Sequence, residues 1–230
     1  MHTKIPSAPT LLVVLAFLGL PAAATASNEP TLTYPTGSLL PVGSKIRGTN
    51  VGGFKVTTTS GTILWECPLN QVTGTLRKNS GSEVEADIES VTVAGTGLGG
   101  ACTKTGIETH WIVNPETNGL PWCLRSTPAM KEDEVQIRGG ACSGASRSIR
   151  TVFRTTITGE TPSVVDCVYE HSGAITGTYT THPSSDAIMT FNGSEWALVA
   201  GTFICGISWK LDMTITLEKD EGTTSPTYIS

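Results

Sequence analysis

The chain has 230 residues, of which 38% are hydrophobic and only 15% are charged, and its formal net charge is −5 at pH 7. Soluble domains average about 25% charged residues, and the 15 Lys and Arg residues are spread along the chain with no run longer than Arg77-Lys78, so a surface for nucleic-acid phosphates is not expected. With 36 Thr, 25 Gly and 13 Pro, the composition favours strands and turns and argues against a helical bundle.

Residues 1–26 have the pattern of a signal peptide. Lys4 precedes an apolar run from Leu11 to Leu20, and small residues follow up to Ala26. The run is about half of the roughly 20 residues that cross a bilayer, so a retained membrane anchor is the weaker alternative. We expect cleavage after Ala26, no membrane span after cleavage, and a secreted or cell-envelope protein.

Residues 27–44 contain three prolines and are predicted to form an extended N-terminal leader without a core of its own. Residues 45–230 are predicted to be an all-β region, either an antiparallel β-sandwich or barrel-like sheets. Similar halves are expected at about 45–115 and 155–219, because a cysteine, a Gly-Thr pair and a second cysteine recur at matching spacing. Residues 116–154, a segment bridged by its own pair of cysteines, would join the two halves.

The strands are predicted from alternating apolar residues and the turn signals between them. The clearest strand places Ile207, Trp209, Leu211, Met213, Ile215 and Leu217 on one face. The alternation that begins at Val84 changes phase at Val91, so a bulge near Glu89 and Ser90 is expected. Further strands are predicted at 54–58, 62–67, 72–77, 107–113, 149–158, 164–170, 174–181, 187–191 and 196–204, with a turn at Asn192-Gly193.

An even number of cysteines in an exported chain predicts disulfides, and we expect three. Six cysteines allow 15 pairings, between which sequence alone cannot choose. The recurrent pattern supports pairing of neighbours along the chain. Metal binding is the alternative, but no pair has the two-residue spacing of common zinc sites. The six residues are Cys67, Cys102, Cys123, Cys142, Cys167 and Cys205.

Three short motifs suggest chemistry but have simpler explanations. The glycines of 95–100 have the spacing of a dinucleotide-binding loop, yet no helix follows them, so a loop is expected. Residues 140–144 imitate a nucleophile elbow around Cys142, but an all-β chain lacks its strand-to-helix turn, so a bridged turn is expected. Residues 114–118, Asn-Pro-Glu-Thr-Asn, resemble a cell-wall sorting signal but lie in mid-chain without the hydrophobic tail that such signals require, so a turn is expected.

Two groups of residues are candidate binding surfaces. Alternate carboxylates on one strand could supply paired acids or bind calcium, although a solvated strand face is the more common role for such a row. Among the five Trp, Trp65, Trp111 and Trp209 lie on apolar strand faces and are expected in the core, whereas Trp122 and Trp196 are the candidates for exposure. For Trp122, packing against a neighbouring cystine is the more common arrangement. The acidic row consists of Glu83, Glu85, Asp87 and Glu89.

No set of residues predicts catalysis or a cofactor. The expected mature chain has three His, none in a metal-binding motif. We therefore predict no catalytic residues, no metal site and no cofactor.

The export signal, the Leu-Pro-Trp-Cys-Leu string at 120–124 and the strand at 209–213 together resemble secreted bacterial proteins of disulfide-linked all-β type, and the resemblance implies no activity. The resulting hypothesis is an exported, non-catalytic β protein that binds an unidentified envelope or extracellular component or has a structural role there. The alternatives are a secreted hydrolase that uses paired carboxylates and a cation-dependent adhesion module.

Overall fold

The computed structural model describes residues 31–33, 37–67, 69–94, 102–104, 111–131, 133–157, 163–180, 187–202, 205, 208–220, 224–226 and 228–229. Strands make up 71% of the structure, which confirms the all-β class. In chain order the described strands are β1 (Leu32–Thr33), β2 (Lys45–Asn50), β3 (Phe54–Thr57), β4 (Ile63–Cys67), β5 (Leu69–Asn79), β6 (Val84–Ala94), β7 (Thr103–Lys104), β8 (Trp111–Asn118), β9 (Trp122–Ser126), β10 (Glu134–Gly139), β11 (Ile149–Ile157), β12 (Ser163–His171), β13 (Ala174–Thr180), β14 (Ala187–Ala200), β15 (Ser208–Asp220), β16 (Thr224–Pro226) and β17 (Tyr228–Ile229).

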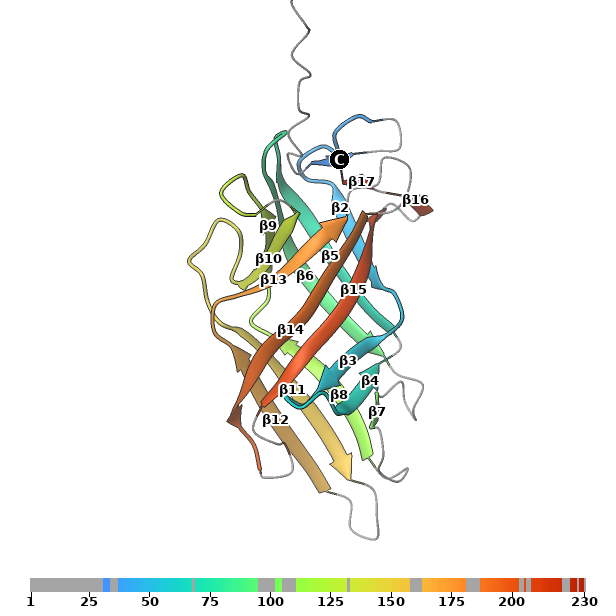
Figure 1. Cartoon of the computed structure of the whole chain (residues 1–230), viewed down its shortest axis with the longest axis vertical. Coiled ribbons are helices and arrows are strands. Elements are labelled where there is room, and N and C mark those ends of the chain that lie inside the picture. Colours follow the sequence, from blue (N-terminus) through green and yellow to red (C-terminus); the bar gives the residue numbers. More distant parts are fainter. Residues whose placement is uncertain are drawn as a thin grey trace, which may run out of the picture.

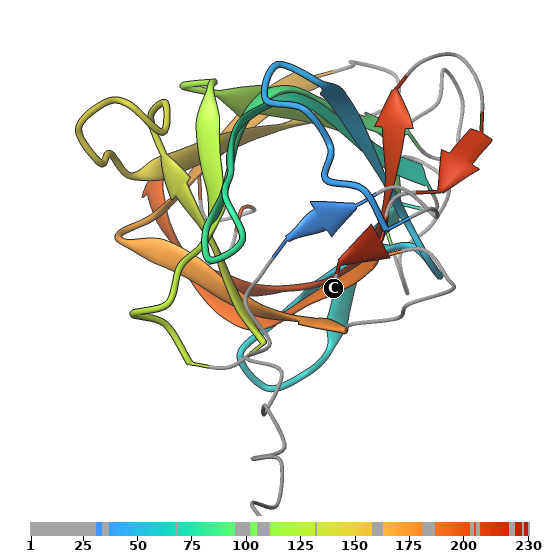
Figure 2. The ribbon, with the colours of Figure 1, turned by 90° about the horizontal axis from the view of Figure 1, so that it is seen from above.

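Eight strands close into an antiparallel barrel. Their order around the barrel is β15, β2, β5, β6, β9, β10, β13 and β14, and β14 pairs again with β15. Figure 2 shows these strands as a ring around a central axis. Of the two architectures expected from the sequence, the barrel is therefore the one formed. Closure gives every barrel strand two neighbours and so removes sheet edges that would otherwise pair with other chains.

Six further strands, β3, β4, β7, β8, β11 and β12, extend the sheet below the barrel (Figure 1). The first half of β15 pairs with β3, which continues through β4 to β7. The second half of β14 pairs with β12, which continues through β11 to β8. β7 and β8 lie near each other. The two long strands β14 and β15 therefore belong both to the barrel and to this lower sheet.

Strand β15 shows why the barrel has a continuous core. Its alternate residues are buried, and the residues between them are partly exposed, because side chains alternate between the two faces of a strand. This confirms the predicted one-sided strand, except for Ile207, which lies outside the described residues. The buried residues are Trp209, Leu211, Met213, Ile215 and Leu217, all at most 8% exposed.

The predicted bulge in β6 is confirmed. Thr73 of β5 pairs with Ser90 and Gly74 pairs with Ile88, so Glu89 has no residue opposite it. The extra residue brings Val91 back to the side that packs against the core.

The expected turn at Asn192-Gly193 is wrong, because both residues lie within β14. Asn192 pairs with Asp212 and Ser194 with Leu211, which leaves Gly193 as an extra residue with φ +72°. A bulge uses the same left-handed glycine conformation as a tight hairpin turn, so an Asn-Gly pair in the sequence is compatible with either structure.

The expected turn at 114–118 is also wrong, because these residues belong to β8 and pair with β11. Among the described strands, β8 ends the sheet order. A sheet edge tolerates the missing N–H of Pro115, which explains how a proline lies in a strand.

The three disulfides join neighbours along the chain, as expected: Cys67 to Cys102, Cys123 to Cys142, and Cys167 to Cys205. The first ties the short β7 to the end of β4. The second fastens the turn after β10 to β9. The third holds residue 205 against β12.

The N-terminal stretch contributes side chains to the barrel. Leu32 and Leu40 are at most 1% exposed. The side chain of Asn79 donates to both of their carbonyl oxygens, at 2.7 and 2.9 Å, and accepts from the amide of Leu32 at 3.0 Å. β1 pairs with β17, and the two lie across one end of the ring in Figure 2. One amide side chain therefore fastens this stretch to the end of β5.

Candidate functional site

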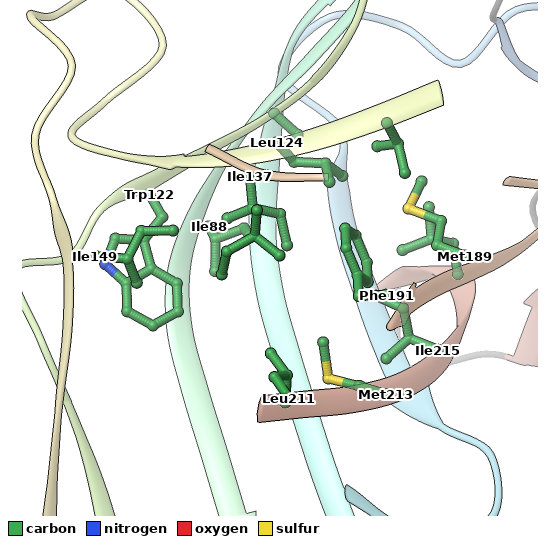
Figure 3. Packing of buried hydrophobic residues seen from close by; sticks show 14 of the residues in the cluster. Ile88, Trp122, Leu124, Ile137, Ile149, Met189, Phe191, Leu211, Met213 and Ile215 are labelled. Atoms are coloured by element: carbon green, nitrogen blue, oxygen red, sulfur yellow. The ribbon is translucent and has the colours of Figure 1, made fainter. Parts of the chain in front are cut away.

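An apolar cavity of about 60 Å³ lies inside the molecule, between the barrel and the lower sheet. Of the fourteen side chains that line it, none is charged, and apart from the indole N–H groups of three Trp only Thr151 is polar. Figure 3 shows part of this wall, where Ile88, Ile137 and Phe191 gather above Leu211 and Met213. The cavity is therefore suited to a neutral occupant, because a charged group would lose its hydration without compensation.

Two smaller voids continue along the barrel. A void of about 30 Å³ shares Val72, Ile88, Ile137 and Met213 with the main cavity. A third, of about 10 Å³, reaches Leu32 at the capped end. Met213, one of the residues that line both of the first two voids, has an unbranched, adaptable side chain.

Five aromatic residues line the main cavity, and two of them form a stacked pair. Trp196 of β14 and Trp209 of β15 are directly opposite each other in the strand register. Their rings are 4.8 Å apart between centroids and only 6° from parallel. Cross-strand aromatic contacts of this kind contribute about 0.5–1.5 kcal/mol beyond the area they bury. We call Trp196 and Trp209 the indole pair.

The indole nitrogens of the cavity wall have no hydrogen-bond partner within the described structure. This applies to Trp122, Trp196 and Trp209, which line the cavity, and to Trp65, which does not. All four rings are at most 8% exposed. A buried donor without a partner costs about 1–3 kcal/mol, so each of these indoles lowers the stability of the fold.

Further aromatic contacts hold the indole pair in place. Phe153 meets the edge of Trp209 at 5.4 Å and stacks on Trp65 at 4.8 Å. Tyr169 packs edge-on against Trp209 at 5.5 Å, and its hydroxyl donates to the carbonyl oxygen of Cys205. Burial raises the pKa of the Tyr169 phenol well above its usual value. The cavity floor is thus a packed group of rings tied to the third disulfide.

Trp122 and Trp196, the two candidates for exposure, are both buried. Trp122 occupies an inward position of β9. Trp196 is five residues after the inward-facing Phe191, which would place it on the outer face of a regular strand. The bulge at Gly193 restores it to the inner face. A bulge at Asn192-Gly193, in place of the expected turn, would have predicted that Trp196 lies in the interior.

The acidic row does not form a free carboxylate surface. Asp87 is only 5% exposed, and its two oxygens accept from Nε of Arg77 and from the amide of Cys142, both at 2.7 Å. The guanidinium of Arg138 donates to three carbonyl oxygens of the same turn, at residues 141, 142 and 144. This turn is the bridged turn expected around Cys142, and its sulfur is held in a disulfide.

The other carboxylates of the row also face cations. Glu83 forms an ion pair with Lys78. Glu89 accepts from Lys45 and from Thr75, each at 2.7 Å, and these two hydrogen bonds lower the pKa of its carboxyl. Glu85 pairs with Lys78 in the strand register.

No group of three or more His, Cys, Asp or Glu among the described residues is placed to hold a metal ion. The described part of the chain also contains no helix long and apolar enough to cross a membrane. The glycine-rich motif at 95–100 and the side chain of Trp111 lie outside the described residues.

No protein-family model matches the chain, and no curated protein or solved structure is significantly similar to it. The candidate site is therefore argued from its own geometry.

Proposed function

We propose that this protein is an exported, non-catalytic β-barrel that binds a small apolar molecule in its interior, at the cell envelope or outside the cell. The observation that supports this best is the apolar cavity next to the indole pair. Barrels of about eight strands are wide enough to hold one small ligand among their interior side chains. Binding sites of this type are mostly apolar, with few polar groups.

The size of the cavity limits the occupant. An engineered apolar cavity of roughly 150 Å³ binds benzene, whereas this one measures about 60 Å³. A ligand that fits without rearrangement is therefore smaller than benzene. A longer apolar molecule would need the adjoining void of about 30 Å³, which shares Met213 and three other lining residues with the main cavity.

Export is supported by the covalent framework. Disulfides persist in oxidising compartments and are rare in the cytosol, and this chain has three. The signal-peptide pattern at 1–26 agrees with this location. Thiol titration and N-terminal sequencing of the secreted product test the proposal: we expect no reactive thiol and a first residue of Ser27, and free thiols or an intact Met1 would contradict export.

The alternatives have less support from the geometry. A hydrolase with paired carboxylates or a cation-dependent adhesion module would use the acidic row. Asp87 and Glu89 are instead both held by Arg77, and Glu89 also by Lys45. Carboxylates engaged in this way stabilise the outer face of the barrel, which favours the interior as the binding site.

The test uses the protein recovered after export, with its disulfides intact, and propene as an apolar probe of three carbon atoms, which is smaller than benzene. Methyl NMR signals of Ile88, Ile137 and Met213 should shift in a saturable manner as the probe is added. Absence of saturable shifts at these cavity residues would overturn the proposed function.

Two variants with the same chemical change locate the binding. Val91 lines the cavity, so Val91→Phe fills it and should weaken probe binding at least tenfold. Val199 is 50% exposed, so Val199→Phe should bind as the unchanged protein does. Equal affinities for the two variants would place the probe elsewhere and contradict interior binding.

A further inference from the structure

Asn192 and Gly193 form an Asn-Gly pair at the bulge of β14. Both residues are exposed, and a Cβ atom built on Gly193 would meet no atom within 4 Å. Asparagine is a thermolabile residue, and it loses ammonia most readily before glycine, because no side chain shields the backbone nitrogen that attacks it. The bulge therefore exposes a chemically reactive dipeptide to solvent.

The reaction joins the backbone nitrogen of Gly193 to the side chain of Asn192. The nitrogen loses its proton and bonds to Cγ, the bond from Cγ to the side-chain nitrogen breaks, and ammonia leaves with the proton. One water molecule then opens the succinimide ring. Opening at Cγ gives aspartate, whereas opening at the main-chain carbonyl carbon gives isoaspartate, in which the backbone runs through the former side chain.

Asp212 of β15 holds the nitrogen that has to attack. Its Oδ1 accepts from the backbone N–H of Gly193 at 3.0 Å, and it pairs with Asn192 in the strand register. This hydrogen bond has to break before the nitrogen can bond to Cγ, and a negative charge beside the amide opposes the loss of its proton. The carboxylate therefore slows the first step in the folded protein.

We propose that Asn192-Gly193 is a site of spontaneous covalent modification, at which Asn192 becomes aspartate or isoaspartate, and that Asp212 restrains this conversion in the folded protein. Neither step needs a ligand in the cavity. Isoaspartate lengthens the backbone by one carbon atom at the bulge that places Trp196 on the inner face of β14. Conversion should therefore disturb the indole pair.

The test follows the exported protein, with its disulfides intact, during incubation at pH 8. Peptide mapping by mass spectrometry detects the replacement of the side-chain NH₂ of Asn192 by OH. In Asp212→Ala, conversion should be about threefold to tenfold faster than in the unchanged protein, which corresponds to the usual net contribution of a hydrogen bond. Equal rates in the two proteins would overturn the restraint by Asp212.

Asp166→Ala is the matched control, because Asp166 is a half-exposed carboxylate of β12 that pairs with Arg154 of β11. It should leave the rate of conversion at Asn192 unchanged. A similar acceleration in both variants would mean that a general loss of stability exposes the site, and the assignment to Asp212 would be wrong.

The unchanged protein also provides a test that needs no variant. After reduction and unfolding in urea, Asn192 should react about as fast as Asn118, which also precedes a glycine, and faster than Asn192 does in the folded protein. If Asn192 does not react in the unfolded chain, the modification site is wrong, and if folding does not slow its conversion, the restraint is wrong.

The isoaspartate form can be separated from the unconverted protein by ion exchange. Its near-ultraviolet circular dichroism should differ from that of the unconverted protein, because the packing of the indole pair changes. Identical spectra would contradict the effect on Trp196.

Discussion

Gly177 of β13 lies directly against the ring of Phe191, a cavity residue on the neighbouring strand β14. A Cβ atom at Gly177 would be 2.5 Å from Cδ1 of Phe191 and 2.5 Å from the carbonyl oxygen of Thr190. Part of this obstruction is backbone, so it cannot be relieved by a change of rotamer alone. The Gly-Thr pair noticed in the sequence therefore has a packing role, in which the glycine makes room for an aromatic ring inside the barrel.

We predict that Gly177→Ala lowers the free energy of unfolding by about 1–3 kcal/mol, because the added Cβ overlaps the carbonyl oxygen of Thr190 and the ring of Phe191 and the backbone must shift to relieve the overlap. The midpoint of urea unfolding measures this. Gly144→Ala is the control, since a Cβ there would meet its nearest atom, the carbonyl oxygen of Ala141, at an ordinary 3.5 Å, and should change stability by less than about 0.5 kcal/mol. Equal losses of stability in the two variants would contradict this packing role, because they would show that Phe191 and the backbone of β14 move aside at little cost.

Asn79→Ala should loosen the N-terminal stretch. The change removes three hydrogen bonds to the buried backbone of Leu32 and Leu40, and leaving such groups without partners costs about 1–3 kcal/mol each. We expect faster amide hydrogen exchange at these two leucines, measured by mass spectrometry, together with lower overall stability. Asn192→Ala, at an exposed position of β14, should leave exchange at both leucines unchanged. Unaltered protection in the Asn79 variant would contradict the fastening role.

Asp87 and Glu85 look equivalent in the sequence but differ in the structure. Asp87→Asn removes the charge that accepts from Arg77 and turns one oxygen into a donor facing a donor. We predict a loss of about 1.5–3 kcal/mol, the usual contribution of hydrogen bonds to charged groups. Glu85→Gln should change stability by less than about 0.5 kcal/mol. Urea unfolding measures the free energy of unfolding of both variants. A similar loss of stability in both would mean that Asp87 does not fasten the bridged turn.

The features that the sequence predicts correctly are those encoded locally. The alternation from Trp209 to Leu217 identifies a strand with one buried face, and the phase change before Val91 identifies the bulge at Glu89. Neighbouring cysteines also pair as expected. Each of these depends on residues that are close in the chain or recur at a regular interval.

Closure of the barrel could not be predicted in this way, because it depends on pairing between distant segments. Arg47 of β2 and Glu218 of β15 form an ion pair at 2.8 Å across 171 positions of sequence, and local periodicity contains no information on that register. The candidate site depends on the same long-range pairing. Trp209 could be placed in the core from its own strand, but its partner Trp196 could not, because the bulge at Gly193 reads as a turn.

The hydrogen bond from Tyr169 to Cys205 predicts a loss of stability at alkaline pH. Burial raises the pKa of Tyr169 in the folded protein, so the contribution of the neutral phenol is complete below the unfolded pKa of about 10. Above it, only the unfolded chain releases the proton, and stability falls by up to about 1.4 kcal/mol per pH unit. Urea unfolding from pH 8 to pH 11 should therefore show the unchanged protein losing its advantage over Tyr169→Phe. A constant difference between the two across this range would mean that the phenol is not held neutral by the fold.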